Sequence, residues 1–222
     1  AAHGLSVPVV LHEANAIPGR AVMFLARYAK TVCVGFPGAA ASFPKRRVAV
    51  TGFPVREDLD LLCRRNNKTS DRFTVLVMGG SQGAHRLNVL ASGALCRLHE
   101  KGMKVNVIHL AGIQDEAVMR AQYRAGGIPH KVYGFLRDMG KAYGSANLAI
   151  ARSGAGTCAE LLVCSLPSIL VPLPSARRNH QRRNAEEIAK LWGAEVIVES
   201  DLSEAVLADR IEMYYCHPDK LT

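Results

Sequence analysis

The alternation of short apolar runs with segments of helical spacing constrains the fold of this chain more than any other feature. Six runs have the apolar character of buried strands, and they span 73–78, 105–110, 131–135, 146–150, 168–172 and 194–198. Between them, Leu87, Leu90, Ala91, Ala94, Leu95 and Leu98 recur at helical spacing, and further helices are predicted over 114–125, from 138, and over 157–165, 180–192 and 203–215. Strands that alternate with helices predict right-handed crossovers and a parallel, doubly wound α/β sheet.

A shorter α/β pattern precedes this one. It consists of a strand at 7–11, a helix at 18–30 and strands at 31–36 and 48–51, which is too little for a domain with its own core. The polar stretch at 57–72 is typical of a linker. We therefore predict the C-terminal part of one α/β domain in residues 1–56, a linker in 57–72, and most of a second domain in 73–222. Because the chain starts with Ala and opens almost at once on a strand, we expect a piece of a longer protein.

Charge and cysteine spacing narrow the classes of function. The net charge of +9 across 222 residues indicates phosphate-bearing partners, which include nucleotides, nucleic acid and anionic membranes. Aromatic residues make up only 6% and do not alternate with basic residues, so RNA binding is not favoured. The six cysteines form no C-x-x-C pair, so neither a metal site nor a redox motif is predicted. Their scattered spacing fits a reducing compartment.

Ligands of open α/β sheets bind beyond the carboxyl ends of the strands, so the turns that follow the strands are where we look for ligand-binding residues. The first such turn is GGSQGAHRLN at 79–88. Gly79, Gly80 and Gly83 let the backbone approach a ligand, and Ser81 with the following helix start offers donors to a phosphate or a sugar hydroxyl. A tight turn capped by Ser81 explains the same residues without a ligand.

The second turn, RSGAGTCAE at 152–160, carries little side chain at a predicted helix start. Its small residues are Ser153, Gly154, Ala155 and Gly156. Their bare N–H groups attract an anion such as a pyrophosphate, and Glu160 lies one turn further on, within reach of a ribose. The alternative is that Thr157 and Glu160 form a capping box, which needs no ligand.

The third turn, at 172–187, opens a helix with His180 and Gln181, whose side chains can donate to hydroxyls or phosphate oxygens. Four arginines surround them, and a solvated basic loop is the alternative interpretation. Three polar turns at one sheet edge favour one shared ligand over three separate structural explanations. Earlier in the chain, HEANAIPG at 12–19 carries Asn15, and Arg56 precedes the linker, where it could face a cleft.

Five motifs together are similar to those of the MurG family of N-acetylglucosaminyltransferases. HEANAIPG, TGFPVR, GGSQGAHRLN, RSGAGTCAE and HQ-x-x-NA stand in the order and spacing of that family, over about residues 7–210. The resemblance implies a GT-B fold, with the end of an acceptor-side Rossmann-like domain followed by most of a donor-binding one. It also implies an inverting hexosyltransferase that moves N-acetylglucosamine from its UDP donor to lipid I, forming lipid II for peptidoglycan. The implied location is peripheral, at the cytoplasmic face of the bacterial inner membrane.

The resemblance further implies roles for single residues. Arg56 and Ser81 approach the donor pyrophosphate, while Phe135 and Leu136 lie beside the uracil. The turn made of Ser153, Gly154, Ala155, Gly156 and Thr157 holds phosphates and sugar. Glu160 takes the ribose hydroxyls, and His180 and Gln181 hold the sugar hydroxyls. Asn15 faces the catalytic cleft from the acceptor side.

The sequence also departs from the family pattern. The family's first Gly-rich loop is not found, so we expect the general base to lie outside this chain and the chain alone to be catalytically incomplete. Position 179 is Asn where an acidic residue is common, and Ala14 replaces a frequent Gln. No cofactor and no nucleic-acid partner is expected. We expect membrane contact through Lys30, Lys45, Arg46 and Arg47, unless these form a solvated loop. Alternatives are a related GT-B transferase with another acceptor and a non-catalytic nucleotide-sugar-binding module.

Overall fold

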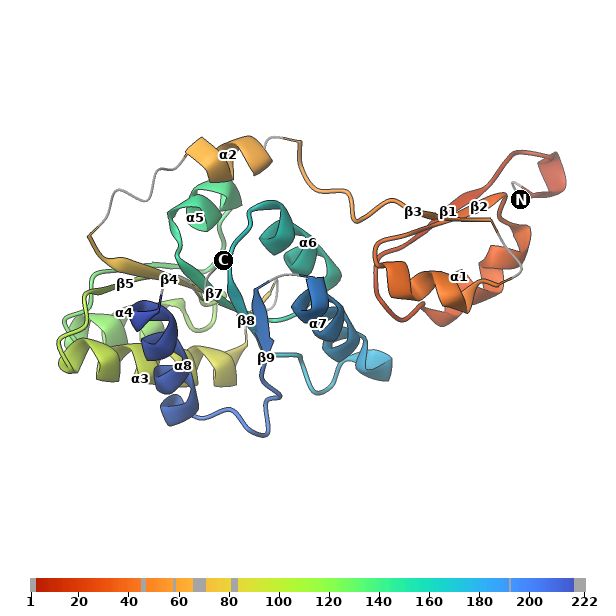
Figure 1. The fold of residues 1–222 in the computed structure, drawn as a ribbon. Helices are drawn as coiled ribbons and strands as arrows, with labels where there is room; N and C mark the ends of the chain where they lie inside the picture. The colour runs from red at the N-terminus through yellow and green to blue at the C-terminus, as the bar shows by residue number, and fades with distance from the viewer. Residues whose placement is uncertain are drawn as a thin grey trace.

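The computed structural model describes residues 3–44, 47–57, 59–65, 71–80, 84–191 and 193–217. Figure 1 shows a small N-terminal unit beside a larger C-terminal one, joined by an extended segment and a helix. Each unit is built on a sheet whose strands pair in parallel. The parallel α/β prediction is therefore confirmed for both parts of the chain.

The small unit holds a sheet in the order β1-β2-β3, with bounds Val10–Glu13, Thr31–Val34 and Val48–Val50. The helix predicted over 18–30 is shorter: α1 spans Arg20–Leu25 and runs into the 3-10 turn η2, Ala26–Tyr28. Two further 3-10 turns, η1 and η3, span His3–Leu5 and Pro37–Ser42. Val32, Val34 and Phe43 are buried in its core.

The large sheet has the order β6-β5-β4-β7-β8-β9. Its strands span Phe73–Met78 (β4), Val105–Leu110 (β5), His130–Tyr133 (β6), Leu148–Ala151 (β7), Ser168–Leu170 (β8) and Ala194–Val196 (β9). The chain builds outward from β4 to β6 and then returns to place β7 on the other side of β4. This reversal makes the carboxyl ends of β4 and β7 a topological switch point, where ligands of such sheets bind.

Helices cover both faces of the large sheet. One layer consists of α3 (His85–Glu100), α4 (Glu116–Ala125) and α8 (Glu204–Cys216). The other consists of α5 (Met139–Ser145), α6 (Ala155–Val163) and α7 (His180–Leu191), with the 3-10 turn η4 (Arg177–Asn179) before α7. Successive residues of β4 alternate between the two cores: Val75 and Val77 face the first, Leu76 and Met78 the second. Both faces are thus buried, as the apolar strand sequences predicted.

The polar stretch at 57–72 contains a helix that the sequence did not predict. This helix, α2 (Leu59–Arg65), buries Leu59 against the core of the large unit. Its close approach to α5 depends on Gly140, because a Cβ there would lie 2.5 Å from Cβ of Leu62. A disulfide between Cys63 and Cys164 also ties α2 to the end of α6. The scattered cysteine spacing gave no sign of this pairing.

Candidate functional site

A cavity of about 600 Å³ opens at the carboxyl edge of β4, β5 and β6. Apolar side chains form much of its wall: Met78, Leu110, Phe135, Leu136 and Met139. Polar and charged groups reach it from Arg56, Arg137, Tyr143 and Glu160. A mostly apolar cavity with a few convergent polar groups is the usual form of a small-molecule site. Phe135 is 71% exposed, so its ring is available to a planar ligand group at this cavity.

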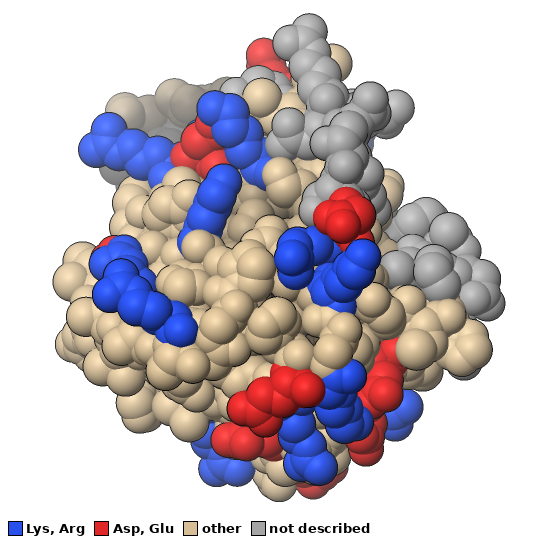
Figure 2. Space-filling model, turned by 90° about the vertical axis from the view of Figure 1, so that its left-hand side faces the viewer, with Lys and Arg blue, Asp and Glu red and all other residues tan. Residues whose placement is uncertain are grey.

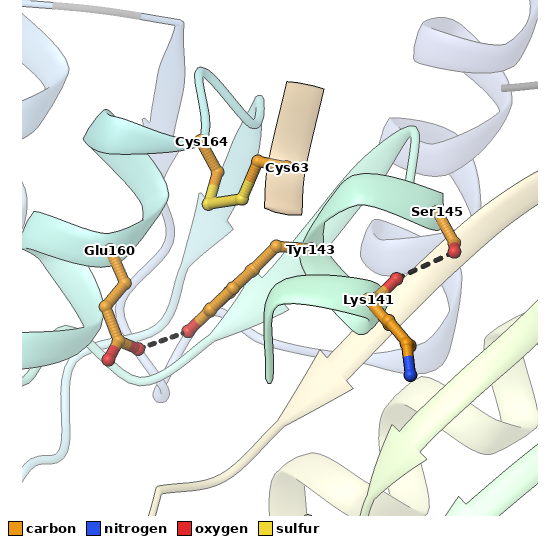
Figure 3. Close-up of a disulfide and its surroundings, with 6 residues drawn as sticks. All are labelled: Cys63, Lys141, Tyr143, Ser145, Glu160 and Cys164. Atoms are coloured by element: carbon orange, nitrogen blue, oxygen red, sulfur yellow. Dashed lines mark hydrogen bonds between the residues drawn. A yellow bond between two sulfur atoms is a disulfide. The ribbon is translucent and has the colours of Figure 1, made fainter. Parts of the chain in front are cut away.

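Glu160 lies on α6, and its carboxylate faces α5 in Figure 3. Its Oε2 accepts a hydrogen bond of 2.6 Å from the hydroxyl of Tyr143. The N-cap of α6 is Gly154, which makes no side-chain capping bond, and Thr157 lies inside the helix. The capping-box interpretation of Thr157 and Glu160 is therefore wrong, and Glu160 is directed to the cavity instead.

The turn before α6 is built to expose backbone donors. Gly154 is extended (φ −62°, ψ 148°), and the hydrogen bond from the N–H of Cys158 to the carbonyl of Gly154 closes the first helical turn at 2.9 Å. The N–H groups of Ala155, Gly156 and Thr157 thus begin the helix, where such groups have no intrahelical partner. Together with the helix dipole they form an anion-binding geometry. The side chain of Ser153 is turned away from this role, because its buried Oγ donates to the carbonyl of Gln181 at 2.8 Å.

Arg152, directly before this turn, is held by contacts within the protein. Its guanidinium is buried, pairs with Glu199 and donates to the carbonyls of Val171 and Pro172 at 3.2 and 3.3 Å. It thereby holds the end of β7 to the segment after β8. Arg152, the charge at the start of the RSGAGTCAE motif, therefore has a structural role. Glu160, the charge at its end, lines the cavity.

His180 and Gln181 stand at the start of α7 and do not line the 600 Å³ cavity. His180 Nδ1 donates to the carbonyl of Arg177 at 2.7 Å, and Gln181 Oε1 accepts from the N–H of Leu173 at 3.0 Å. The same loop borders a second cavity of about 410 Å³, whose lining includes Leu173, Asn179 and Arg182. The basic run is partly paired, since Arg182 and Arg183 both bind Glu186 at 3.0 Å.

The HEANAIPG turn of the small unit reaches the large unit through Asn184, a fully buried residue of α7. Asn184 accepts from the N–H of Ala16 at 2.9 Å and donates to Asn15 Oδ1 at 3.1 Å and to the carbonyl of Ser153 at 3.2 Å. Glu13 is buried and fixes the turn by accepting from the N–H groups of Asn15 and Gly19. Asn15 is thereby placed next to the turn that precedes α6.

The structure brings four of the predicted residues into one cavity: Arg56, Phe135, Leu136 and Glu160. Arg56 also donates to the carbonyl of Arg137 at 3.3 Å. Ser81 lies outside the described residues, but Gly80, in a left-handed conformation (φ 88°), reaches the cavity. Sequence reasoning missed Tyr143 and Asn184. Tyr143 belongs to no motif, whereas Asn184 is the Asn of HQ-x-x-NA and was quoted without a role.

Charge does not form one continuous patch on the face shown in Figure 2, where lysine and arginine side chains lie in several separate groups. Within the described residues, no three His, Cys, Asp or Glu side chains cluster as metal ligands would. No helix among these residues is both long and apolar enough to cross a membrane.

Comparisons with known proteins identify the family of the chain. The model of the glycosyltransferase family 28 C-terminal domain matches residues 74–221. A protein of Ectopseudomonas mendocina (strain ymp), named UDP-N-acetylglucosamine--N-acetylmuramyl-(pentapeptide) pyrophosphoryl-undecaprenol N-acetylglucosamine transferase, is 41% identical over 100% of this chain and 61% of its own length. A protein of the same name from Geobacter metallireducens is 36% identical over 100% of this chain and 62% of its own length.

Among solved structures, the crystal structure of Acinetobacter baumannii MurG matches with a TM-score of 0.81 and 31% identity, over 99% of this chain and 62% of that chain. The chain thus spans about three fifths of the length of these relatives. The GT-B architecture implied by the sequence motifs is confirmed by this match. The chain belongs to glycosyltransferase family 28, through the C-terminal domain that defines the match.

Proposed function

We propose that the protein binds UDP-N-acetylglucosamine and that the whole enzyme transfers its sugar to lipid I, forming lipid II. The observation that carries this proposal is the position of Glu160, whose carboxylate lines the cavity on the helix that starts with bare N–H groups. A carboxylate about one turn from a phosphate-binding helix start suits a nucleoside diphosphate, because it can accept from both ribose hydroxyls. The names of the relatives support the same donor and acceptor.

Each part of the donor has a complementary surface in this proposal. The uracil lies against Phe135 and Leu136, and the ribose hydroxyls donate to Glu160. The diphosphate meets the N–H groups of Ala155, Gly156 and Thr157 at the start of α6, with Arg56 on the cavity wall and Ser81 as a further donor. The sugar extends from there toward His180 and Gln181.

The proposed chemistry is inversion at the anomeric carbon of the donor sugar. As the bond to the UDP oxygen breaks, negative charge develops on the leaving diphosphate. The helix dipole and N–H groups of α6, together with Arg56, stabilise this charge without moving during the reaction. Asn15, held next to the donor turn by Asn184, faces the acceptor. The oxygen of the acceptor hydroxyl forms the new bond to the anomeric carbon, and a general base, which we do not assign to a residue of this chain, takes the hydroxyl proton.

The test is transfer of radiolabelled N-acetylglucosamine from the UDP donor to lipid I by the full-length protein. We expect lipid II as the product and no transfer by an Arg56→Ala, Glu160→Ala double variant that remains folded. Binding of the UDP-sugar without turnover would identify a non-catalytic nucleotide-sugar-binding module. Turnover with a different lipid or aglycone acceptor would identify a related transferase.

We also propose peripheral contact with the cytoplasmic membrane surface, because the acceptor is lipid-linked. Met23, Phe24 and Leu25 on α1 are exposed, and the Arg27 guanidinium lies 3.8 Å from the centroid of the Phe24 ring. Exposed apolar side chains flanked by cations are suited to an anionic lipid surface. Of the basic residues expected to contribute, Lys30 and Arg47 are described, while Lys45 and Arg46 lie outside the described residues.

Vesicle sedimentation tests this contact. Full-length protein should bind vesicles that contain phosphatidylglycerol and leave them at high salt. Phe24→Asp should weaken binding, whereas Leu61→Asp, at an exposed apolar position on α2, should not. Equal binding by both variants and the wild-type protein would mean that another surface contacts the membrane.

A further inference from the structure

Tyr143 is a buried tyrosine that touches the candidate site and that no motif assigns a role. It lies on α5 and is 2% exposed, yet its hydroxyl reaches across to Glu160 on α6 (Figure 3). The two side chains come from different helices and both line the 600 Å³ cavity. The bond between Tyr143 Oη and Glu160 Oε2 is 2.6 Å, the length of a strong hydrogen bond to a carboxylate.

Contacts among three helices hold Tyr143 and Glu160 in this arrangement. α5 packs closely on α2 at Gly140, one turn before Tyr143, and α2 is joined to the end of α6 by the disulfide between Cys63 and Cys164. The helix that carries Tyr143 and the helix that carries Glu160 are therefore both tied to α2. Because both helices are fixed relative to α2, Tyr143 limits the positions that the Glu160 carboxylate can take.

The hydroxyl of Tyr143 also remains a hydrogen-bond donor in the neutral pH range. Burial first, and then the negative charge of Glu160, raise the pKa of Tyr143 well above the ordinary value for a tyrosine. It stays protonated throughout the neutral range and donates to Glu160. A carboxylate has about four lone-pair sites, so one bond from Tyr143 leaves capacity for two further hydroxyl donors.

We propose that Tyr143 is a positioning residue, which holds the Glu160 carboxylate so that it accepts both vicinal hydroxyls of a ribose and thereby selects ribonucleotides over 2′-deoxyribonucleotides. This inference rests on the proposed binding of a uridine diphosphate in the cavity. Tyr143 itself does not touch the sugar. Its effect on the ligand passes through the direction in which the Glu160 oxygens point.

Calorimetric titration with UDP and with 2′-deoxy-UDP tests the inference in full-length protein. The wild-type protein should bind UDP about 10-fold more tightly than 2′-deoxy-UDP, because the deoxy compound lacks one hydrogen bond to a charged group. Tyr143→Phe removes only the hydroxyl and should reduce this preference to about 3-fold or less, mainly through weaker UDP binding. A folded Tyr143→Phe variant with the wild-type preference overturns the inference.

The chain offers a matched control in Tyr214. Its hydroxyl also donates to a glutamate, Glu195 Oε2 at 3.5 Å, and neither residue lines the cavity. Tyr214→Phe should leave the preference for UDP unchanged. An equal loss of preference in both variants would reflect general loosening of the fold and would overturn the assigned role.

A further variant keeps the inference testable if Tyr143→Phe does not fold, and a double variant sharpens the test if it does. Glu160→Asp retains the charge and Tyr143 but withdraws the carboxylate by one methylene, so it should lose the preference as well, and a retained preference overturns the inference. In a Glu160→Gln background, adding Tyr143→Phe should change the preference no further, because the tyrosine acts only through the carboxylate. An additional loss there also overturns it.

The proposed function and this inference fail in different ways. If the wild-type protein does not bind UDP, the proposed function is wrong and the inference falls with it. A different result would show that only the positioning role is wrong. In that case the wild-type protein binds UDP and Glu160→Gln loses the ribose preference, but Tyr143→Phe keeps this preference.

Discussion

Two tyrosine–glutamate pairs in the large unit differ in what surrounds the carboxylate. At the edge of the sheet, Glu195 on β9 accepts from Tyr214 and also pairs with Arg210 at 3.0 Å. At the cavity, Glu160 accepts from Tyr143 at 2.6 Å, and its carboxylate lines the cavity wall. The first carboxylate has its charge balanced within the protein. The second accepts a hydrogen bond from a buried tyrosine and lines a cavity.

The difference indicates which pair is structural and which is poised for a ligand. A buried or half-buried carboxylate costs free energy unless its acceptor capacity is used. Arg210 meets that need for Glu195, so the pair links β9 to α8 without further partners. Glu160 retains capacity toward a cavity that is otherwise largely apolar, and a vicinal diol would use it.

A third buried tyrosine extends the comparison, because Tyr123 pairs with a histidine instead of a carboxylate. His109 is fully buried between Tyr123 and Asn88, and burial lowers its pKa from 6.5 to about 4, against the opposing effect of Asp115. Above pH 6.5 the ring is neutral in both folded and unfolded protein. Below that pH the unfolded chain takes up the proton first, so the free energy of unfolding falls as the pH drops toward 4.

Protonation of His109 should lower the free energy of unfolding by about 3 kcal/mol between pH 7 and pH 4. Urea denaturation at pH 7, 5 and 4 should show it as the difference in pH dependence between the wild-type protein and His109→Gln. The variant should lose less stability on acidification, whatever its stability at pH 7. Parallel curves would mean that His109 is not held neutral in the folded state.

The second prediction separates the two glutamates directly. Glu160→Gln should weaken UDP binding by about 10- to 100-fold, because a hydrogen bond to a charged group contributes roughly 1.5–3 kcal/mol. Glu195→Gln makes the same chemical change at the edge pair and should leave UDP affinity unaltered. Calorimetry on both variants measures the contrast. Equal affinities in the two variants would remove the distinction between the pairs.

The third and smallest effect concerns the sugar end of the site. Gln181→Ala should weaken binding of UDP-N-acetylglucosamine by about 5-fold relative to UDP, the loss of roughly one neutral hydrogen bond. Arg183→Ala, which removes an exposed ion pair two residues further along α7, serves as the control. Parallel losses for the sugar nucleotide and for UDP would indicate a disturbed loop, since Gln181 also holds the N–H of Leu173.

Much of the fold could be predicted because local sequence determines it. The runs at 73–78 and 105–110 coincide with β4 and β5, since strands buried on both faces are apolar throughout. The start of α6 was placed two residues too late, at 157 instead of Ala155, because Gly154 and Gly156 obscure the helical pattern. That shift made a capping box of Thr157 and Glu160 seem possible.

The parts that could not be predicted depend on contacts between distant segments. Cys63 and Cys164 are 101 residues apart, and neither stands in a spacing that indicates a partner. α2 lies in a polar stretch, and burial of Leu59 against the large unit helps define it. Tyr143 and Glu160 meet because α5 and α6 lie side by side on one face of the sheet. The motifs pointed to the carboxylate, and the structure shows the tyrosine hydroxyl that binds it.

A crystal structure of the protein with UDP bound tests the central claim most directly. We expect both ribose hydroxyls within about 3 Å of the Glu160 oxygens, the hydrogen bond from Tyr143 retained, and the phosphates at the N–H groups that begin α6. UDP bound elsewhere, or bound here with its ribose directed away from Glu160, would contradict the account.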